Sequence, residues 1–376
     1  MFGRYRERQI AAALAQGGKV VVLYGPRQVG KTTLLQAVMA AVGGRSLLLN
    51  GDFVDDRHRL RPERPALAAL LQGVDHLFVD EAQNVPDIGV SLKLVHDHFP
   101  AVRVLATGSS SLALVQRTGE PLTGRQRTFL LYPISYAEQQ PDVLTGRTVL
   151  ERAMVYGSYP EVLGMQDPDA RALHLRQLAG DALLKDLFAH VDVNRRKLFD
   201  ILRLLALQIG AEASLSEIAS TVQIDAKTVG RYLDLLEDTF VIVRLRGFSR
   251  NLRKEVGKSQ KVYFVDLGIR NALLNAFQPL SGRDDVGRLW ENLMVVERVK
   301  CNAYAGIDAN YWFWRTYDRQ EIDLIEETAS GLRAFEFKWG KAKKAPPKLF
   351  AATYPDARVD VIDPDAAHAL LQQPAP

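Results

Sequence analysis

The segment that most restricts how this chain can fold lies near its start. Residues 25–32 read GPRQVGKT and match the phosphate-loop pattern G-x-x-x-x-G-K-[ST] at every fixed position. The apolar, β-branched run 20–24 before it predicts a buried strand, and residues 33–42 predict a helix that Gly43 and Gly44 end. A glycine turn that merely contains a lysine is the alternative, and it would not require a strand and a helix on either side. The segment therefore predicts a site for a nucleoside triphosphate.

Each fixed position has a physical task at such a site. Gly25 and Gly30 let backbone N–H groups turn inward around the phosphates, Lys31 places a charge against the β and γ oxygens, and the Thr32 hydroxyl is a ligand for Mg²⁺. The N-terminus of the following helix adds a partial positive charge. The predicted nucleotide-binding residues are Gly25, Pro26, Arg27, Gln28, Val29, Gly30, Lys31, Thr32 and Thr33.

A second predicted strand ends in the acids that hydrolysis requires. The run 76–80 is apolar and ends in Asp80, and Glu81 follows directly. We expect Asp80 to hold Mg²⁺ directly or through water, and Glu81 to polarise the attacking water. Two acids at the start of an ordinary loop are the alternative. Beside the phosphate loop, they predict Mg²⁺-dependent hydrolysis.

Ser109 and Arg125 are further candidates for the catalytic site. The third predicted strand, 102–107, ends just before Ser109, which would face the triphosphate because the ends of parallel strands share one edge of a sheet. Ser109 is therefore a candidate sensor of the γ-phosphate, with a helix-capping turn as the alternative. Arg125 is a candidate arginine finger, offered in cis or to a neighbouring subunit of a homo-oligomer. A solvated surface arginine is its alternative.

The composition is that of an ordinary globular protein. At 376 residues the chain has room for two or three domains, and its net charge of +4 is too small to predict a polyanion partner by itself. A single cysteine, Cys301, excludes a disulfide framework and a cysteine-based zinc site. The longest apolar runs are far shorter than the roughly 18 residues typical of a membrane span. We therefore expect a cytoplasmic protein without a membrane partner.

Several segments together resemble a known family. They read GPRQVGKTTLL, VDEAQ, TGSSS, LTGR with a following YPIS, and GSYPE. This set is similar to the prokaryotic AAA-type ATPases that carry a C-terminal domain of unknown function, which are relatives of the archaeal ATPases. The resemblance implies an α/β fold with an AAA-type P-loop core and a parallel sheet. It also implies ATP as the nucleotide, and a helical and winged-helix section after the core.

The predicted organisation has four segments. An ATPase core over 1–140 precedes a helical lid or connector over 141–200, a winged helix-turn-helix over 201–266 and a nuclease-like α+β domain over 267–376. Residues 214–237 predict two short helices joined by a tight turn. Ser214 and Glu217 would form a capping box on the first helix, and Asp225 would cap the second. Strands over 240–245 and 261–266 would flank the wing.

Basic residues concentrate between positions 244 and 261, which is typical of contacts to a phosphate backbone. This stretch contains Arg244, Arg246, Arg250, Arg253, Lys254, Lys258 and Lys261. The second helix offers few side chains for reading bases, so we expect DNA to be recognised by its structure rather than its sequence. A winged helix that serves only as a packing module is the alternative. The predicted DNA-binding residues are Lys227, Thr228, Arg231, Arg250, Arg253, Lys254 and Lys258.

A last group of residues predicts a second metal site. Strands over 321–327 and 332–339 would form a hairpin that places Asp323 opposite Glu336, with Cβ atoms about 5 Å apart. Lys338 would share that face, and Glu291 lies on a preceding predicted helix. Two carboxylates at this separation can share a divalent metal, and a nearby lysine can activate water.

This D…E-x-K arrangement resembles the restriction-endonuclease-like nucleases. The resemblance implies a second Mg²⁺ or Mn²⁺ held by Glu291, Asp323 and Glu336 with Lys338. The same register also places Glu321 opposite Lys338 and Glu326 opposite Arg333, so ordinary cross-strand ion pairs are the alternative. Whether such a domain cuts DNA stays open.

The sequence thus predicts an AAA-type ATPase that binds DNA and remodels or processes it. The rival from another class is a regulatory or signalling NTPase whose winged helix and C-terminal domain bind protein and whose nuclease-like fold is inactive. Stimulation of ATP turnover by branched or single-stranded DNA would separate the two.

Overall fold

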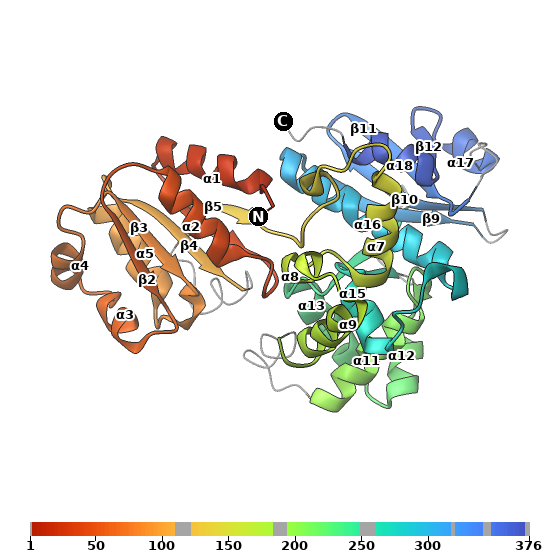
Figure 1. Ribbon diagram of the computed structural model, residues 1–376, viewed down its shortest axis with the longest axis horizontal. Helices are drawn as coiled ribbons and strands as arrows, with labels where there is room; N and C mark the ends of the chain where they lie inside the picture. The colour runs from red at the N-terminus through yellow and green to blue at the C-terminus, as the bar shows by residue number, and fades with distance from the viewer. Residues whose placement is uncertain are drawn as a thin grey trace. The chain divides into compact units, whose positions relative to one another are not determined.

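The chain forms two compact units (Figure 1). The computed structural model describes residues 2–109, 122–182, 194–248, 260–316, 320–340 and 347–372. One unit contains residues 1–133 with 238–240, and the other contains 134–237 with 241–376. The predicted end of the ATPase core at 140 therefore lies close to the boundary between the units. The lid, the winged helix and the C-terminal segment, which the sequence predicts as separate parts, share the second unit.

The first unit is built on a five-stranded sheet whose neighbouring strands are all parallel, in the order β2-β3-β4-β1-β5. Parallel strands covered on both faces read as continuous apolar runs, which is why β1 and β3 are recognisable in the sequence. The bounds are β1 Val20–Tyr24, β2 Ser46–Asn50, β3 His76–Asp80, β4 Arg103–Gly108 and β5 Gln126–Leu130.

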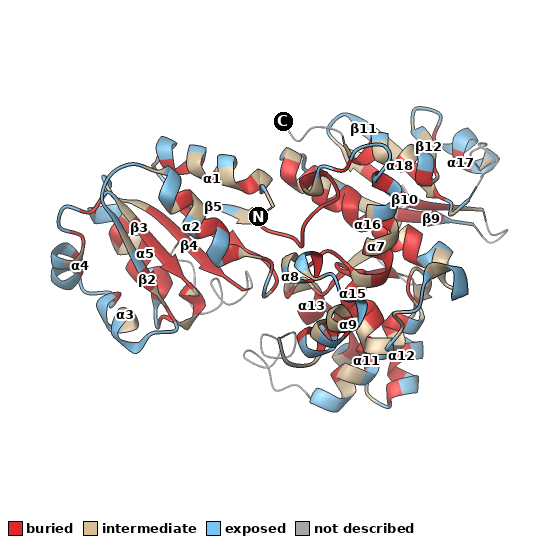
Figure 2. Cartoon of the chain, in the orientation of Figure 1, coloured by how far each residue is buried: buried red, intermediate tan, exposed pale blue. Residues whose placement is uncertain are grey.

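Helices cover both faces of this sheet. On one face, Val20 and Val22 belong to the same apolar core as Leu92 and Val95 of α5. Val21 points to the opposite face, where α1 and α2 contact the strands and each other. Figure 2 shows the buried residues along the strands between these helical layers. The helices are α1 Tyr5–Gln16, α2 Lys31–Ala41, α3 Val54–Arg59, α4 Arg64–Leu70, η1 Ala82–Asn84 and α5 Ile88–His98.

The second unit combines helices with a seven-stranded mixed sheet in the order β12-β11-β10-β9-β7-β8-β6. Its strands are β6 Glu212–Ala213, β7 Ile242–Gly247, β8 Gln260–Phe264, β9 Asn310–Arg315, β10 Glu321–Thr328, β11 Gly331–Phe337 and β12 Arg358–Ile362. Its helices are η2 Ala137–Gln139, α7 Gly146–Tyr156, α8 Pro160–Gly164, α9 Pro168–Gln177, η3 Leu178–Ala182, α11 Arg195–Leu207, α12 Leu215–Val222, α13 Ala226–Asp238, α15 Leu267–Leu274, η4 Leu280–Gly282, α16 Val286–Ala305, α17 Lys348–Thr353 and α18 Pro364–Leu371.

The predicted helix-turn-helix is confirmed as α12 and α13, followed by the antiparallel strands β7 and β8. Asp225 caps α13, because its Oδ1 accepts a hydrogen bond from Thr228 N at 2.8 Å. The predicted capping box at Ser214 is wrong. Among the described contacts, Ser214 Oγ meets Ser216 Oγ at 2.8 Å and gives α12 no side-chain cap.

The wing strands continue into the C-terminal sheet. Strand β7 pairs in parallel with β9, with Arg246 opposite Trp312 and Gly247 opposite Phe313. The predicted boundary between 266 and 267 therefore does not separate two sheets. The pairing of β7 with β9 uses backbone N–H and C=O groups, which every edge strand exposes. The side chains of β7 therefore do not indicate which strand will pair with it.

The β10–β11 hairpin has the register that the sequence predicts. Leu324 lies opposite Phe335, Glu326 opposite Arg333 and Thr328 opposite Gly331. On one face Leu324 and Phe335 share the main apolar core with Trp290 of α16. A smaller core that includes Ile322, Ile325 and Phe350 of α17 lies against the other side. None of the described helices is both long and apolar enough to span a bilayer.

Candidate functional site

The phosphate loop leaves β1 through a backbone that only some residues can adopt. A Cβ atom at Gly25 would lie 2.1 Å from the carbonyl oxygen of Leu131, so this position requires glycine. Gly30 has a φ of 92° and Gln28 a φ of 60°, both in the left-handed region. Val29, within the loop, is fully buried. The path of the loop is therefore set by local backbone geometry.

Lys31 and the start of α2 face the inside of this loop. Lys31 is buried, and its Nζ donates to Gly25 O at 2.9 Å and to Pro26 O at 2.8 Å. Helix α2 begins at Lys31 with Gly30 as its N-cap and, among the described residues, no side chain caps it. The first N–H groups of a helix without a side-chain cap attract an anion. Thr32 and Thr33 lie on the exposed side of this first turn.

Asp80 connects the loop to the neighbouring strand. Thr32 Oγ1 donates to Asp80 Oδ2 at 2.7 Å, and the hydroxyl of Thr107 donates to Asp80 Oδ1. Asp80 is buried at the end of β3, and the register places Tyr24 of β1 opposite Gly108 of β4. The three strand ends therefore meet at one edge of the sheet, as predicted. Thr107 was not among the predicted site residues, although it belongs to the TGSSS segment.

Glu81 takes a left-handed conformation, with φ of 48°. Its N–H donates to Thr107 Oγ1 at 3.3 Å, and the amide of Gln83 donates to its carboxylate. A Cβ atom at Gly51 would lie 2.2 Å from the carbonyl oxygen of Glu81, so the chain passes very close to this residue. A non-glycine residue held in this conformation stores backbone strain, which is common at functional sites. Gln83 orients the carboxylate that the sequence assigns to water activation.

Ser109 and Arg125 lie at opposite ends of the sheet. Ser109 is buried and follows Gly108, so it lies at the same edge as the phosphate loop. The carbonyl of Arg125 accepts a hydrogen bond from Val20 N at 2.8 Å, at the far end of β1. The five residues of β1 separate that end from the loop by roughly 16 Å. Arg125 therefore cannot reach the nucleotide of its own chain, and the cis version of the arginine-finger prediction is wrong.

The Arg125 side chain forms an exposed ion pair. Its Nε donates to Asp97 Oδ1 at 2.9 Å. Hydrogen bonds from Arg125 and His96 lower the pKa of Asp97 to about 2. A role for Arg125 towards a neighbouring subunit stays a prediction.

Arg4 is a contact of the loop that sequence reasoning missed. Its Nη1 donates to Val29 O at 2.9 Å and its Nη2 to Tyr132 O at 2.7 Å. Arg4 thus connects the segment before α1 to the phosphate loop and to the residues after β5. In the sequence it is one of several arginines near the N-terminus, and a bond to a residue 128 positions away leaves no local pattern.

The described part of the winged helix offers fewer basic groups than the sequence predicts. Lys227 and Arg231 are exposed one turn apart on α13. Thr228 instead bonds to the residue that caps the helix, because its hydroxyl donates to Asp225 Oδ2 at 2.6 Å. Arg244 is also engaged, since it pairs with Asp234 at 2.7 Å and with Glu237. Arg250, Arg253, Lys254 and Lys258 lie outside the described residues.

Two of the residues predicted for the nuclease site meet around a lysine. Lys261 Nζ lies 2.8 Å from Glu291 Oε1 and 3.8 Å from Asp323 Oδ1, and it also contacts the carboxylate of Glu321. Tyr263 donates to Glu291 Oε1 at 2.6 Å. Lys261 was predicted as part of the basic wing, but it is only 2 % exposed. The prediction that Lys261 belongs to a basic DNA-contacting stretch is therefore wrong, because Lys261 is paired with acidic residues.

The other two predicted residues pair with each other. Lys338 Nζ lies 2.9 Å from Glu336 Oε1, while Asp323 Oδ2 accepts a hydrogen bond from Phe337 N at 2.8 Å. The alternative cross-strand pairs do not form either, because Glu321 contacts Lys261 and Glu326 binds Arg298. Among the described residues, no three His, Cys, Asp or Glu side chains are placed to share a metal ion. As arranged here, the predicted nuclease residues do not fit a divalent metal.

Burial and nearby charges shift the pKa values of both Asp323 and Lys261. Burial, with the nearby charge of Glu291, raises the pKa of Asp323 to about 8. Burial alone would lower the pKa of Lys261, but the surrounding carboxylates raise it above its usual range. Lys261 is therefore an ammonium ion at neutral pH.

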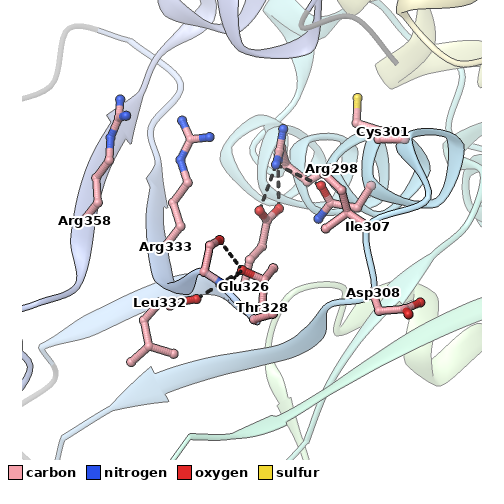
Figure 3. A pocket seen from close by; sticks show the side chains of 14 residues that line it. Arg298, Cys301, Ile307, Asp308, Glu326, Thr328, Leu332, Arg333 and Arg358 are labelled. Carbon is pink, nitrogen blue, oxygen red and sulfur yellow. Dashed lines mark hydrogen bonds and ion pairs between the residues drawn. The ribbon is translucent and has the colours of Figure 1, made fainter. Parts of the chain in front are cut away.

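A separate cavity of about 630 Å³ lies between the C-terminal half of α16 and the turn of the β10–β11 hairpin (Figure 3). Figure 3 shows Arg298 reaching Glu326, with Nε to Oε1 and Nη2 to Oε2 both at 2.8 Å. Arg333 and Arg358 also line the cavity and both pair with Asp360. The buried charges of this cavity are thus matched, and none of the residues predicted for the nuclease site lines it.

Three segments of the chain match known domain families. Residues 17–140 match the family described as an AAA domain. Residues 147–280 match a domain of unknown function, DUF8612, and residues 286–362 match another, DUF4143.

Relatives and a solved structure extend the similarity over most of the chain. An uncharacterized protein of Mycobacterium tuberculosis is 28% identical over 325 residues, which cover 85% of this chain and 70% of the relative. One of Haemophilus influenzae is 24% identical over 238 residues, covering 60% of this chain and 56% of the relative. A Walker-type ATPase of Pyrococcus abyssi shares the fold, with a TM-score of 0.50, 16% identity and coverage of 73% of this chain and 96% of that one. The chain is therefore similar to AAA-type P-loop ATPases that carry a C-terminal domain of unknown function, with the AAA domain at residues 17–140.

Proposed function

We propose that the AAA domain binds ATP with Mg²⁺ and hydrolyses it. The observation that carries the proposal is the bond of 2.7 Å between Thr32 Oγ1 and Asp80 Oδ2, at the same sheet edge as the buried ammonium of Lys31. A hydroxyl and a carboxylate so placed are the ligands that Mg²⁺ takes in phosphate-loop proteins, together with phosphate oxygens and water. The preference for adenine over guanine comes from the family resemblance.

Each residue of the site has a separate role in the proposed hydrolysis of ATP. Lys31 stabilises negative charge on the β and γ oxygens, and the N-terminus of α2 adds to that effect. Thr32 and Asp80 would hold Mg²⁺, which would supply positive charge against the negative charge that develops in the transition state. Glu81, oriented by Gln83, positions and polarises the attacking water. Ser109 is the proposed γ-phosphate sensor.

Binding of a fluorescent ATP analogue to Lys31→Ala tests the site. Loss of a charge-assisted contact removes about 1.5–3 kcal/mol, which corresponds to roughly a tenfold to hundredfold weaker affinity. Lys19→Ala is the matched control, because Lys19 is exposed and lies just before β1, at the end remote from the loop. Removal of Mg²⁺ by chelation should stop turnover. Equal affinity of wild type, Lys31→Ala and Lys19→Ala would refute the site.

We also propose that the winged helix binds DNA and that ATP turnover drives remodelling of that DNA. The supporting observation is the pair of exposed cations, Lys227 and Arg231, on the second helix of the helix-turn-helix. Neither residue is expected to specify sequence, because binding of this kind depends on backbone phosphates. Because Arg244 and Lys261 are already paired, the contribution of the wing strands is smaller than the sequence predicts.

Retention of forked DNA at several salt concentrations tests this second proposal. Wild type should lose affinity steeply with salt, and a Lys227→Glu, Arg231→Glu double variant should bind more weakly with a shallower slope. An Arg8→Glu, Lys19→Glu double variant, at two other exposed cations, controls for the same change of net charge. If no DNA is retained and no DNA changes the rate of ATP turnover, the regulatory alternative, a nucleotide switch that binds protein, is favoured instead.

A further inference from the structure

We propose that the ammonium of Lys261 is the resident cation of the acidic cluster formed by Glu291, Glu321 and Asp323, in place of a divalent metal. The Lys261 cluster, as we name these four residues, is then a structural joint held by ion pairs and not the catalytic centre that the nuclease resemblance implies. The inference is independent of ATP and of the proposed DNA binding.

The ammonium of Lys261 lies among the three acidic residues. A lysine ammonium has three N–H donors and no acceptor. Lys261 Nζ is within 2.8 Å of Glu291 Oε1 and 3.8 Å of Asp323 Oδ1, and it contacts Glu321 as well. With 2 % of its surface exposed, Lys261 has water largely replaced by these carboxylates. Burial of the cation is thus compensated by its close contacts to Glu291 and Glu321, with Asp323 at the longer distance.

A divalent metal at this cluster would have to share its carboxylate oxygens with the ammonium. A Mg²⁺ or Mn²⁺ ion binds carboxylate oxygens at roughly 2.0–2.2 Å. An ion bound to the Glu291 oxygen that accepts from both Lys261 and Tyr263 would compete with two existing bonds. It would also approach a buried positive charge in surroundings that screen poorly. Metal and ammonium therefore exclude each other at this cluster.

The Lys261 cluster connects three elements of the second unit. Lys261 lies on β8 of the winged helix, Glu291 on α16, and Glu321 and Asp323 on β10. Strands β7 and β9 separate β8 from β10 in the sheet. The aromatic ring of Phe313 on β9 lies 5.7 Å from Lys261 Nζ, which places the ammonium over the intervening strands. The cluster thus fastens the wing to the helix and sheet of the C-terminal segment.

The proposal predicts that removal of the ammonium opens a divalent-cation site. Lys261→Met keeps much of the length of the side chain but leaves the acidic residues Glu291, Glu321 and Asp323 without their cation. The full-length variant, without nucleotide, should bind one Mn²⁺ that wild type does not bind. The free Mn²⁺ signal in electron paramagnetic resonance measures this directly, and the Lys261→Met, Asp323→Asn double variant should lose the added site. Lys261→Arg retains a cation and should behave as wild type.

Wild type itself supplies a test that does not depend on the folding of any Lys261 variant. Its Mn²⁺ titration, and its cleavage of DNA in Mn²⁺, should be unchanged by Asp323→Asn. An Mn²⁺ site or a nuclease activity in wild type that Asp323→Asn removes would overturn the proposal. A folded Lys261→Met variant, judged by circular dichroism, that binds no additional Mn²⁺ would also overturn it, because Lys261 would then not be what excludes the metal.

Discussion

Breaking the buried ion pair between Arg298 and Glu326 should be among the most destabilising single changes in the second unit. Their side chains are 6% and 4% exposed, and two parallel bonds of 2.8 Å join them. Replacement of one partner leaves the other charge buried without its counter-ion, which costs about 3–5 kcal/mol. Glu326→Leu should therefore reduce the folded-to-unfolded ratio more than about a hundredfold. An Arg298→Met, Glu326→Leu double variant should recover most of that loss, because an apolar pair of similar volume removes the uncompensated charge.

Urea unfolding followed by tryptophan fluorescence measures this effect in the right unit. All four tryptophans of the chain, Trp290, Trp312, Trp314 and Trp339, belong to the second unit. With a urea slope of about 2–3 kcal/mol per molar, the midpoint of Glu326→Leu should fall by roughly 1–2 M.

The matched control is Glu151→Leu. Glu151 forms an exposed pair with Arg147 on α7, with the side chains 41% and 58% exposed. Exposed pairs of this spacing contribute only about 0.3–0.5 kcal/mol, so the midpoint should hardly move. If Glu326→Leu shifts the midpoint no more than Glu151→Leu does, the buried pair does not carry the free energy that its burial implies.

Three further outcomes can be measured. Gly157→Ala should lower the unfolding free energy by about 1–3 kcal/mol in a thermal melt, because φ is 69° and the new Cβ would lie 1.9 Å from Asp266 Oδ1. Gly287→Ala, where nothing lies within 4 Å, should not lower it. Arg125→Ala should leave ATP affinity at the wild-type value, since Arg125 lies at the far end of β1, and a tenfold loss would contradict that topology. Although burial opposes ionisation, hydrogen bonds from two arginines hold the pKa of Asp285 at about 2. A lowered pKa stabilises the fold above the unfolded value of about 4 and loses that effect as pH falls towards 2. Acid unfolding should therefore be shallower in Asp285→Asn, and an unchanged profile would refute the assignment.

Structural features formed by residues close together in the chain could be predicted from the sequence. The phosphate loop was predicted because a strand, a glycine turn and a helix lie next to one another in the chain. The register of the β10–β11 hairpin was predicted because a tight turn at residues 328–331 fixes which residues oppose each other. In both cases the determining contacts lie within about twenty residues, and side-chain periodicity reports them.

Contacts between distant segments could not be predicted in the same way. Lys261 is one basic residue among many in its stretch, and only the fold places it beside acids that follow it by 30 to 62 positions. Arg4 reaches Tyr132, and β7 joins β9, with no local sign of either contact. The acidic residues on α16 and β10 suggest a metal site when they are considered alone. Their cation, Lys261, comes from β8, so the local sequence does not reveal that they are already paired.

The most direct test of the hydrolytic site compares binding and turnover in Glu81→Gln. This change keeps the shape of the side chain and removes the charge that polarises water, while Lys31, Thr32 and Asp80 stay in place. Loss of a general base lowers a rate by about 10²–10⁴-fold. Glu81→Gln should bind ATP and Mg²⁺ with wild-type affinity but release phosphate at least about a hundredfold more slowly. Phosphate release by Glu81→Gln at the wild-type rate would contradict the role of Glu81 in hydrolysis.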